Sequence, residues 1–168
     1  MTPIRWSYKK VDKVNLDFSK LLLFLPINFI VNKITYLKGD ATRSIGEGNK
    51  IICHICNDIG AWGAGFVLAV SKRWKEPEEA YRKMNAEGRT LGTTMIVPAE
   101  DDISVANMIA QRGVGFSSDG QLPIRYGALR AAFAAANNVA YKTNATPHMP
   151  RIGCGLAGGK WNEVEKNN

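Results

Sequence analysis

The chain has 168 residues, of which 45% are hydrophobic and 22% charged, a balance typical of one globular domain that buries its core without disulfides or metals. Its formal net charge of +7 does not by itself indicate nucleic-acid binding, because the excess is uneven. Residues 1–33 hold six basic and two acidic side chains, whereas the rest hold 16 and 13, with no Lys/Arg block interleaved with aromatic residues. This mildly basic remainder still suits an anionic ligand.

The three cysteines, an odd number, do not indicate a disulfide framework. Cys53 and Cys56 form a C-x-x-C sequence inside the apolar run 51–56, where residues three apart point to opposite faces of a strand. No second pair of ligands accompanies them, and His148 is the only histidine besides His54. We therefore expect free, largely buried thiols and neither a metal nor another cofactor. Free thiols imply a reducing compartment, so a cytoplasmic protein is expected.

Residues 1–33 differ in character from the rest of the chain, and we predict a poorly defined basic and apolar extension there, followed by one domain over 34–168. The run from Leu21 to Val31 is membrane-like, but it is well short of the roughly 20 residues of a spanning helix. Pro26 and Asn28 also interrupt it. We expect no association with a membrane.

From residue 34 onward, strand patterns alternate with helix patterns. In chain order we predict a strand at 34–38, a buried strand at 50–56, helices at 66–74 and from Glu76, strands at 94–97 and 105–109, an Ala-rich helix at 123–139, and a strand at 148–152. The buried strand is a continuous apolar run, and the long helix has Ile124, Leu129 and Phe133 on its apolar side. This alternation predicts an α/β fold with helices on both faces of a sheet.

Two glycine-rich segments, Gly60–Gly65 and Gly153–Gly159, each follow a predicted strand and precede a predicted helix. Glycine lets the backbone approach an anion closely and direct several N–H groups at it, and ligands of open α/β sheets bind at the carboxyl ends of strands. Neither segment is a Walker loop, and the first does not have the spacing of a dinucleotide-binding fingerprint. Two such loops in one small domain suggest a diphosphate held from both sides.

The chain from Ile34 to Trp161, about three quarters of its length, resembles a macrodomain. The similarity is to the Appr-1-p processing branch that includes yeast ADP-ribose-1″-phosphate phosphatase and terminal ADP-ribose protein glycohydrolase. It is carried by the blocks Ile34–Asp40, His54–Asn57 with Trp62–Gly65, and Met149–Leu156. The resemblance implies a three-layer α/β fold with a central mixed sheet and helices on both faces. It also implies binding of ADP-ribose, with hydrolysis of ADP-ribose-1″-phosphate as a further activity.

The resemblance also implies roles for individual residues. Asp40 resembles the acid that accepts from the adenine amino group, although a turn residue after Gly39 is the alternative. Asn57 resembles the asparagine that touches the distal ribose, with a loop-capping amide as the alternative. His54 matches a proposed catalytic histidine, with a hydrogen-bonded core histidine as the alternative. Asp58 is a candidate base or a solvated loop acid. The expected ligand-binding residues are Gly39, Asp40, Ala41, Asn57, Gly60, Ala61, Trp62, Gly63, Ala64, Gly65, Ile152, Gly153, Cys154, Gly155, Leu156 and Ala157.

Two departures from the pattern bear on the reaction. The glycohydrolase members use a lysine and an acid where this chain has Gln111 and Ala157. Gln cannot form a Schiff base and Ala cannot transfer a proton, so the lysine-type mechanism is not expected. Family members also continue with a helix and a closing strand, so we expect a C-terminal truncation that leaves a sheet edge open.

Two alternatives to an ADP-ribose-1″-phosphate hydrolase remain open from the sequence. One is a non-catalytic reader of ADP-ribosylated protein or nucleic acid. The other is a general nucleotide- or RNA-binding module, motivated only by the net charge. The expected partners are ADP-ribose, ADP-ribose-1″-phosphate or ADP-ribosylated macromolecules, bound by a monomer.

Overall fold

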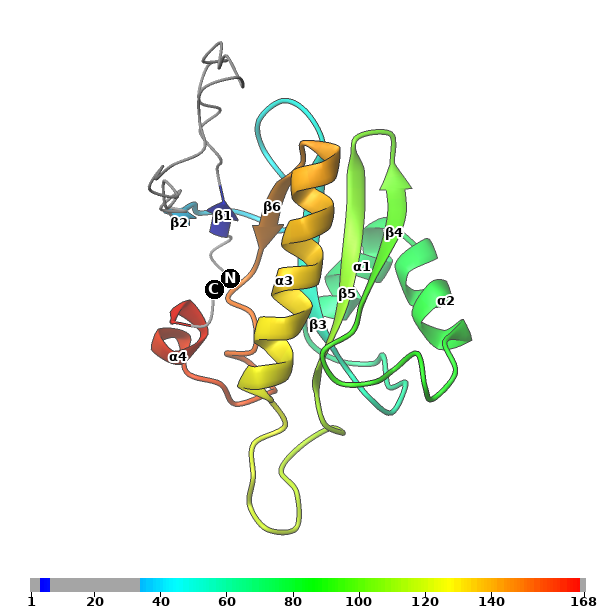
Figure 1. Ribbon diagram of the computed structural model, residues 1–168, viewed down its shortest axis with the longest axis vertical. Helices are drawn as coiled ribbons and strands as arrows, with labels where there is room; N and C mark the ends of the chain where they lie inside the picture. The colour runs from blue at the N-terminus through cyan, green and yellow to red at the C-terminus, as the bar shows by residue number, and fades with distance from the viewer. Residues whose placement is uncertain (1–3, 7–33, 167–168) are drawn as a thin grey trace, which may run out of the picture.

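The computed structural model describes residues 4–6 and 34–166, which form a mixed β-sheet with helices on both faces (Figure 1). The sheet has six strands in the order β2-β1-β6-β3-β5-β4. Strands β6, β3 and β5 are parallel to one another, β4 is antiparallel to β5, and β1 is antiparallel to β2 and β6. The predicted three-layer α/β fold with a mixed sheet is confirmed. The strands are β1 (Ile4–Trp6), β2 (Ile34–Tyr36), β3 (Lys50–Asn57), β4 (Thr94–Glu100), β5 (Ile103–Gln111) and β6 (Thr146–Met149).

Strand β3 is central and is buried on both faces, which is why its sequence is a continuous apolar run. Alternate residues enter two separate cores. Ile51 and Cys53 belong to one, and Ile52 and Cys56 to the other. The two thiols of the C-x-x-C sequence therefore lie on opposite faces, buried and free, as expected.

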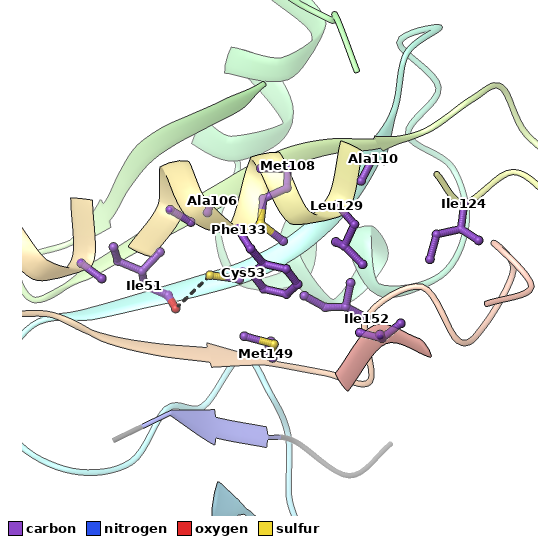
Figure 2. Close-up of a cluster of buried hydrophobic side chains, with 14 of the residues drawn as sticks. Ile51, Cys53, Ala106, Met108, Ala110, Ile124, Leu129, Phe133, Met149 and Ile152 are labelled. Atoms are coloured by element: carbon purple, nitrogen blue, oxygen red, sulfur yellow. Dashed lines mark hydrogen bonds between the residues drawn. The ribbon is translucent and has the colours of Figure 1, made fainter. Parts of the chain in front are cut away.

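Helices α1 (Phe66–Arg73) and α2 (Glu76–Lys83) cover one face of the sheet, and α3 (Tyr126–Thr143) covers the other. Figure 2 shows the α3 side of the core, where Leu129 and Phe133 pack against residues of β3, β5 and β6. Pro77 lies in the first turn of α2, whose acidic residues suit the helix N-terminus. Asn144 ends α3 in the left-handed conformation, with φ of 50°.

The structure differs from the sequence prediction at several boundaries. Helix α3 begins at Tyr126, not at residue 123, because Ile124 pairs with Gln111 in an isolated β-bridge. Strand β6 lies at Thr146–Met149 and ends directly before Pro150. A short helix, α4 (Trp161–Glu165), was not predicted, and its Val164 is buried against the α3 side of the core.

The boundary near residue 33 stays a prediction. Strand β1 lies within the segment assigned to the extension, yet it pairs with both β2 and β6. Residues 7–33, which include the run from Leu21 to Val31, lie outside the described residues. Among the helices that are described, none combines the length and apolar character needed to cross a membrane. Residues 4–6 and 34–166 also contain no group of three or more His, Cys, Asp or Glu side chains placed to hold a metal ion.

Candidate functional site

A cavity of about 350 Å³ lies at the carboxyl ends of the parallel strands, between the two glycine-rich segments. The end of β3, the end of the first glycine loop with the start of α1, Gln111 at the end of β5, and the segment after β6 all contribute to its walls. This is the edge at which open α/β sheets bind ligands. The lining residues are His54, Ile55, Ala64, Gly65, Phe66, Val67, Gln111, Pro150, Arg151, Ile152, Gly153, Gly155, Leu156 and Ala157.

The first glycine loop is shaped by the side chain of Asn57. Its Nδ2 donates to the carbonyl of Ala61 at 2.6 Å, and its Oδ1 accepts from the backbone N–H groups of Ile59 and Ala61 at 3.2 and 2.9 Å. The buried hydroxyl of Tyr81, from α2, also lies 2.9 Å from Oδ1. This geometry supports the loop-capping alternative for Asn57, because the amide is already engaged within the protein.

Asp58 joins the first glycine loop to the end of β5. Its Oδ1 accepts from the backbone N–H of Gly113 at 2.7 Å, and its Oδ2 lies 3.8 Å from Nε of Arg112. The backbone N–H of Asp58 also donates to the carbonyl of Gln111 at 2.9 Å. Asp58 is not among the residues that line the cavity.

Three glycines of the second glycine loop lie where a side chain would be strained or crowded. A Cβ at Gly153 (φ 71°) would lie 2.4 Å from Cδ1 of Ile124, and one at Gly158 (φ 72°) would lie 2.6 Å from Cδ2 of Leu122. A Cβ at Gly159 would lie 2.7 Å from the carbonyl oxygen of Gly153. A side chain is disfavoured at Gly153 and Gly158 mainly by the positive φ, and at Gly159 by the close backbone oxygen.

Gly63 and Gly155 differ from those three glycines. A Cβ at either position would meet nothing within 4 Å, and neither has a positive φ. Gly63 belongs to the first loop, and Gly155 lines the cavity from the second. A Cβ at Gly65 would lie 3.5 Å from Cδ1 of Leu156, so the two loops approach each other there. The open backbone at Gly155 leaves room for a ligand in the cavity to contact the main chain of the second loop closely.

His54 is buried beneath the first glycine loop. Its Nε2 is 2.6 Å from Oδ1 of Asn107, whose Nδ2 donates to the carbonyl of Pro77, so Nε2 carries the proton. The ring packs against Trp62 and Phe66. Burial lowers the pKa of His54 to about 4, which leaves the imidazole neutral near pH 7. The arrangement supports the core-histidine alternative, and a catalytic role stays a prediction.

Asp40 lies outside the main cavity, in a groove of about 520 Å³ that follows the C-terminal half of α1. Its Oδ1 accepts from the backbone N–H of Thr42 at 2.9 Å and from the hydroxyl of Thr42 at 2.8 Å, and these bonds lower the pKa of the carboxyl. Val67 of α1 lines the main cavity, and Arg73 of the same helix lines this groove. The two residues are about 9 Å apart along the helix axis. Gly39 and Ala41 line a small neighbouring hollow with Asp40.

The structure thus brings together about half of the predicted site residues around one cavity. Those that line it are His54, Ala64, Gly65, Ile152, Gly153, Gly155, Leu156 and Ala157. Those placed elsewhere are Gly39, Asp40, Ala41, Asn57, Asp58, Gly60, Ala61, Trp62, Gly63 and Cys154. The lining residues that were not predicted as part of the site are Ile55, Phe66, Val67, Gln111, Pro150 and Arg151. All of these lie directly beside a predicted loop or strand end, which was the signal available in the sequence.

Solved structures identify the family, although no family model matches the chain. A protein of unknown function from Bacteroides thetaiotaomicron is 52% identical, with a TM-score of 0.75, over 78% of this chain and 85% of that one. A macrodomain protein from Streptomyces coelicolor is 44% identical, with a TM-score of 0.65, over 77% of this chain and 84% of that one. The chain belongs to the macrodomain family.

Two curated relatives of this macrodomain carry functional names. The chain is 30% identical over 145 residues to the mouse chromodomain-helicase-DNA-binding protein 1-like, but it spans only 16% of that protein's length. It is 26% identical over 142 residues to the ADP-ribose 1″-phosphate phosphatase of Candida albicans, of which it spans 89%.

In this macrodomain the two departures from the glycohydrolase pattern, Gln111 and Ala157, both line the main cavity. Nε2 of Gln111 donates to the carbonyl of Gly113 at 2.9 Å. Among the fourteen described residues that line the cavity there is no lysine and no carboxylate, and only Arg151 is positively charged near neutral pH. The cavity therefore offers backbone N–H groups and one guanidinium, which suits the binding of an anion more clearly than proton transfer.

Proposed function

We propose that this macrodomain binds ADP-ribose in the main cavity, with the diphosphate between the two glycine loops. The observation that carries the proposal is that Gly65 from the first loop and Gly155 from the second line one cavity at the carboxyl edge of the sheet, and that a Cβ at Gly155 would meet nothing within 4 Å. The relationship to an enzyme named for ADP-ribose 1″-phosphate supports the same ligand. Backbone N–H groups without side chains in the way are well suited to phosphate oxygens.

The adenosine end of the ligand would extend along α1 toward Asp40, and the distal ribose would lie near Gln111. Support for this direction comes from helix α1, whose Val67 lines the cavity and whose Arg73 lines the groove that contains Asp40. The Asp40 carboxylate is suited to accept a hydrogen bond from an exocyclic amine. Its lowered pKa keeps Asp40 ionised at neutral pH. The residues Gly39 and Ala41 would contact the same end of the ligand.

Hydrolysis of ADP-ribose-1″-phosphate is the enzymatic activity that we propose for the site. Water would attack the terminal phosphorus, the bond from phosphorus to the oxygen on C1″ would break, and inorganic phosphate and ADP-ribose would be released. His54, Asn57 and Asp58 remain the candidate catalytic residues. The neutral state of His54 and the engaged amide of Asn57 support positioning of the loop and ligand in preference to proton transfer.

A second candidate function is a reader that binds ADP-ribose units without turnover. It is favoured by the lack of lysines and carboxylates among the described residues that line the cavity. The same observation supports the expectation that the lysine-type glycohydrolase reaction does not occur, because Gln111 and Ala157 stand where its amine and acid would be needed.

Calorimetric titration tests the binding proposal. Wild type should bind ADP-ribose saturably and AMP much more weakly, because AMP lacks the second phosphate and the distal ribose. Gly155→Val should lose ADP-ribose binding while keeping its melting temperature, since the side chain enters open space. Equal affinity for the two ligands would contradict the placement of a diphosphate between two loops.

Incubation with ADP-ribose-1″-phosphate separates the enzyme from the reader. Phosphate release by wild type, lost in Gly155→Val, is the result expected of a phosphatase. Binding of the compound without release would instead establish the reader.

We also propose that the protein works as a monomer in the cytoplasm. Its buried free thiols, Cys53 and Cys56, support a reducing compartment. Light scattering and cell fractionation test these two points.

A further inference from the structure

A second, more open cavity of about 640 Å³ lies next to the main one and has a different chemistry. Its floor is made of small residues, including Gly92 and Ala131, at the N-terminal half of α3 and the segment before β4. Arg112 and Arg125 contribute guanidinium groups to its walls. We refer to this feature as the arginine groove.

The arginine groove and the main cavity lie on opposite sides of one thin wall. Gln111 pairs with Ile124 in a β-bridge, and the backbone N–H of Arg125 donates to the carbonyl of Ala110 at 2.9 Å. Gln111 and Ile124 face the main cavity and the second glycine loop, whereas the next residue along each segment, Arg112 and Arg125, lines the groove. Successive side chains of extended segments point to opposite sides, which explains this division. A chain attached to a ligand near Gln111 would have to pass around the edge of this wall to reach the groove.

The positive charge of the groove is partly offset by two carboxylates, Asp58 near Arg112 and Asp119 near Arg125. Arg112 is 66% exposed, and the nearest carboxylate oxygen, Oδ2 of Asp58, is 3.8 Å from its Nε. Nη1 of Arg125 is fixed by the carbonyls of residues 122–124. The first turn of α3 contains no acidic side chain. The fixed guanidinium of Arg125 and the exposed guanidinium of Arg112, beside small residues, are complementary to carboxylates on an extended chain.

We propose that the arginine groove binds an acidic peptide segment of a protein that carries ADP-ribose, while the ADP-ribose itself occupies the main cavity. This inference rests on the proposed function. A peptide fits the groove better than a nucleic acid does, because base stacking needs an open aromatic face. Tyr126, the aromatic residue that lines the groove, is half-buried, and its hydroxyl accepts from the backbone N–H of Lys160 at 3.0 Å.

The test measures fluorescence anisotropy of full-length protein with two labelled peptides. Each carries one ADP-ribose through a hydrolysis-resistant amide, and its flanking residues are all Glu in one peptide and all Gln in the other. Wild type should bind the Glu peptide about fivefold more tightly than the Gln peptide, the scale expected of a few exposed ion pairs. Added salt should reduce this preference.

Variants test whether the preference for the Glu peptide depends on the arginine groove. Arg112→Gln should reduce it about threefold, and Ala131→Glu, which adds a negative charge at an exposed position of the floor, should reduce it similarly. Free ADP-ribose should bind both variants like wild type. Lys142→Gln and Asn138→Glu make the same charge changes at exposed positions of α3 outside the groove, and they should keep the preference.

Three outcomes would overturn the inference. If wild type binds the two peptides equally and still binds free ADP-ribose, the groove does not bind acidic peptides, but the proposed function stands. If wild type prefers an ADP-ribosylated oligonucleotide to the Glu peptide, and Arg112→Gln loses that preference, the groove binds nucleic acid and not a peptide. If free ADP-ribose does not bind wild type, the proposed function is wrong, and so is the inference that rests on it.

Discussion

The buried imidazole of His54 makes the folded protein sensitive to mild acid. Its pKa is about 4 in the folded state and near the ordinary 6.5 in the unfolded chain. Between these values the unfolded state binds more protons, so the free energy of unfolding falls as the pH is lowered through this window. The difference of about 2.5 pH units, at about 1.4 kcal/mol each, corresponds to about 3 kcal/mol.

His54→Gln removes this titration, and its amide can still donate toward Oδ1 of Asn107. Urea unfolding of both proteins at about pH 7 and about pH 4.5 gives the comparison. The stability of wild type relative to the variant should fall by about 2–3 kcal/mol between the two conditions, most of the full effect. His148 is present in both proteins, so its contribution cancels. Parallel losses of stability in the two proteins would refute the assignment of a buried neutral imidazole.

Four further predictions concern the site and the domain. Gly63→Val should weaken ADP-ribose binding by calorimetry with little change in melting temperature, whereas Gly153→Ala should lower the melting temperature because of its positive φ and its contact with Ile124. Asp40→Ala should cost about 1–3 kcal/mol of ADP-ribose affinity in the same titration, and unchanged affinity would remove Asp40 from the site. A chain that begins at Lys33 should still bind ADP-ribose, because all the residues that line the cavity come after it, but should melt at a lower temperature without strand β1. Wild type should release no ADP-ribose from glutamate-modified protein through a lysine-linked intermediate, and trapping of such an adduct by borohydride would overturn this expectation.

Sequence patterns were sufficient for the parts of the fold in which local preference and tertiary packing agree. The apolar run of β3 predicted a strand buried on both faces, and the Pro and acidic residues near Glu76 predicted the start of α2. They failed where a distant contact decides the conformation. Ile124 fits a helical pattern, but it bridges to Gln111 and packs where Gly153 has no side chain, so the helix starts later.

The candidate site shows the same division. The glycine loops could be predicted because their composition is unusual. The arginine groove could not, because Arg112 and Arg125 come together only through the pairing of β5 with the segment before α3. The loop-capping role of Asn57 could be anticipated as an alternative, but its contact with Tyr81 could not, since Tyr81 comes from a separate helix.

The way in which Asn57 and Tyr81 hold the first glycine loop has a consequence for the speed and selectivity of recognition. The loop conformation is fixed by hydrogen bonds internal to the protein, so its ordering entropy is lost during folding and is not lost again when the ligand binds. A ligand that meets a preformed loop needs no slow rearrangement before it docks, and association is then limited by diffusion and orientation. The same rigidity disfavours ligands of the wrong shape, because a loop that cannot change its conformation cannot form hydrogen bonds to a misplaced phosphate.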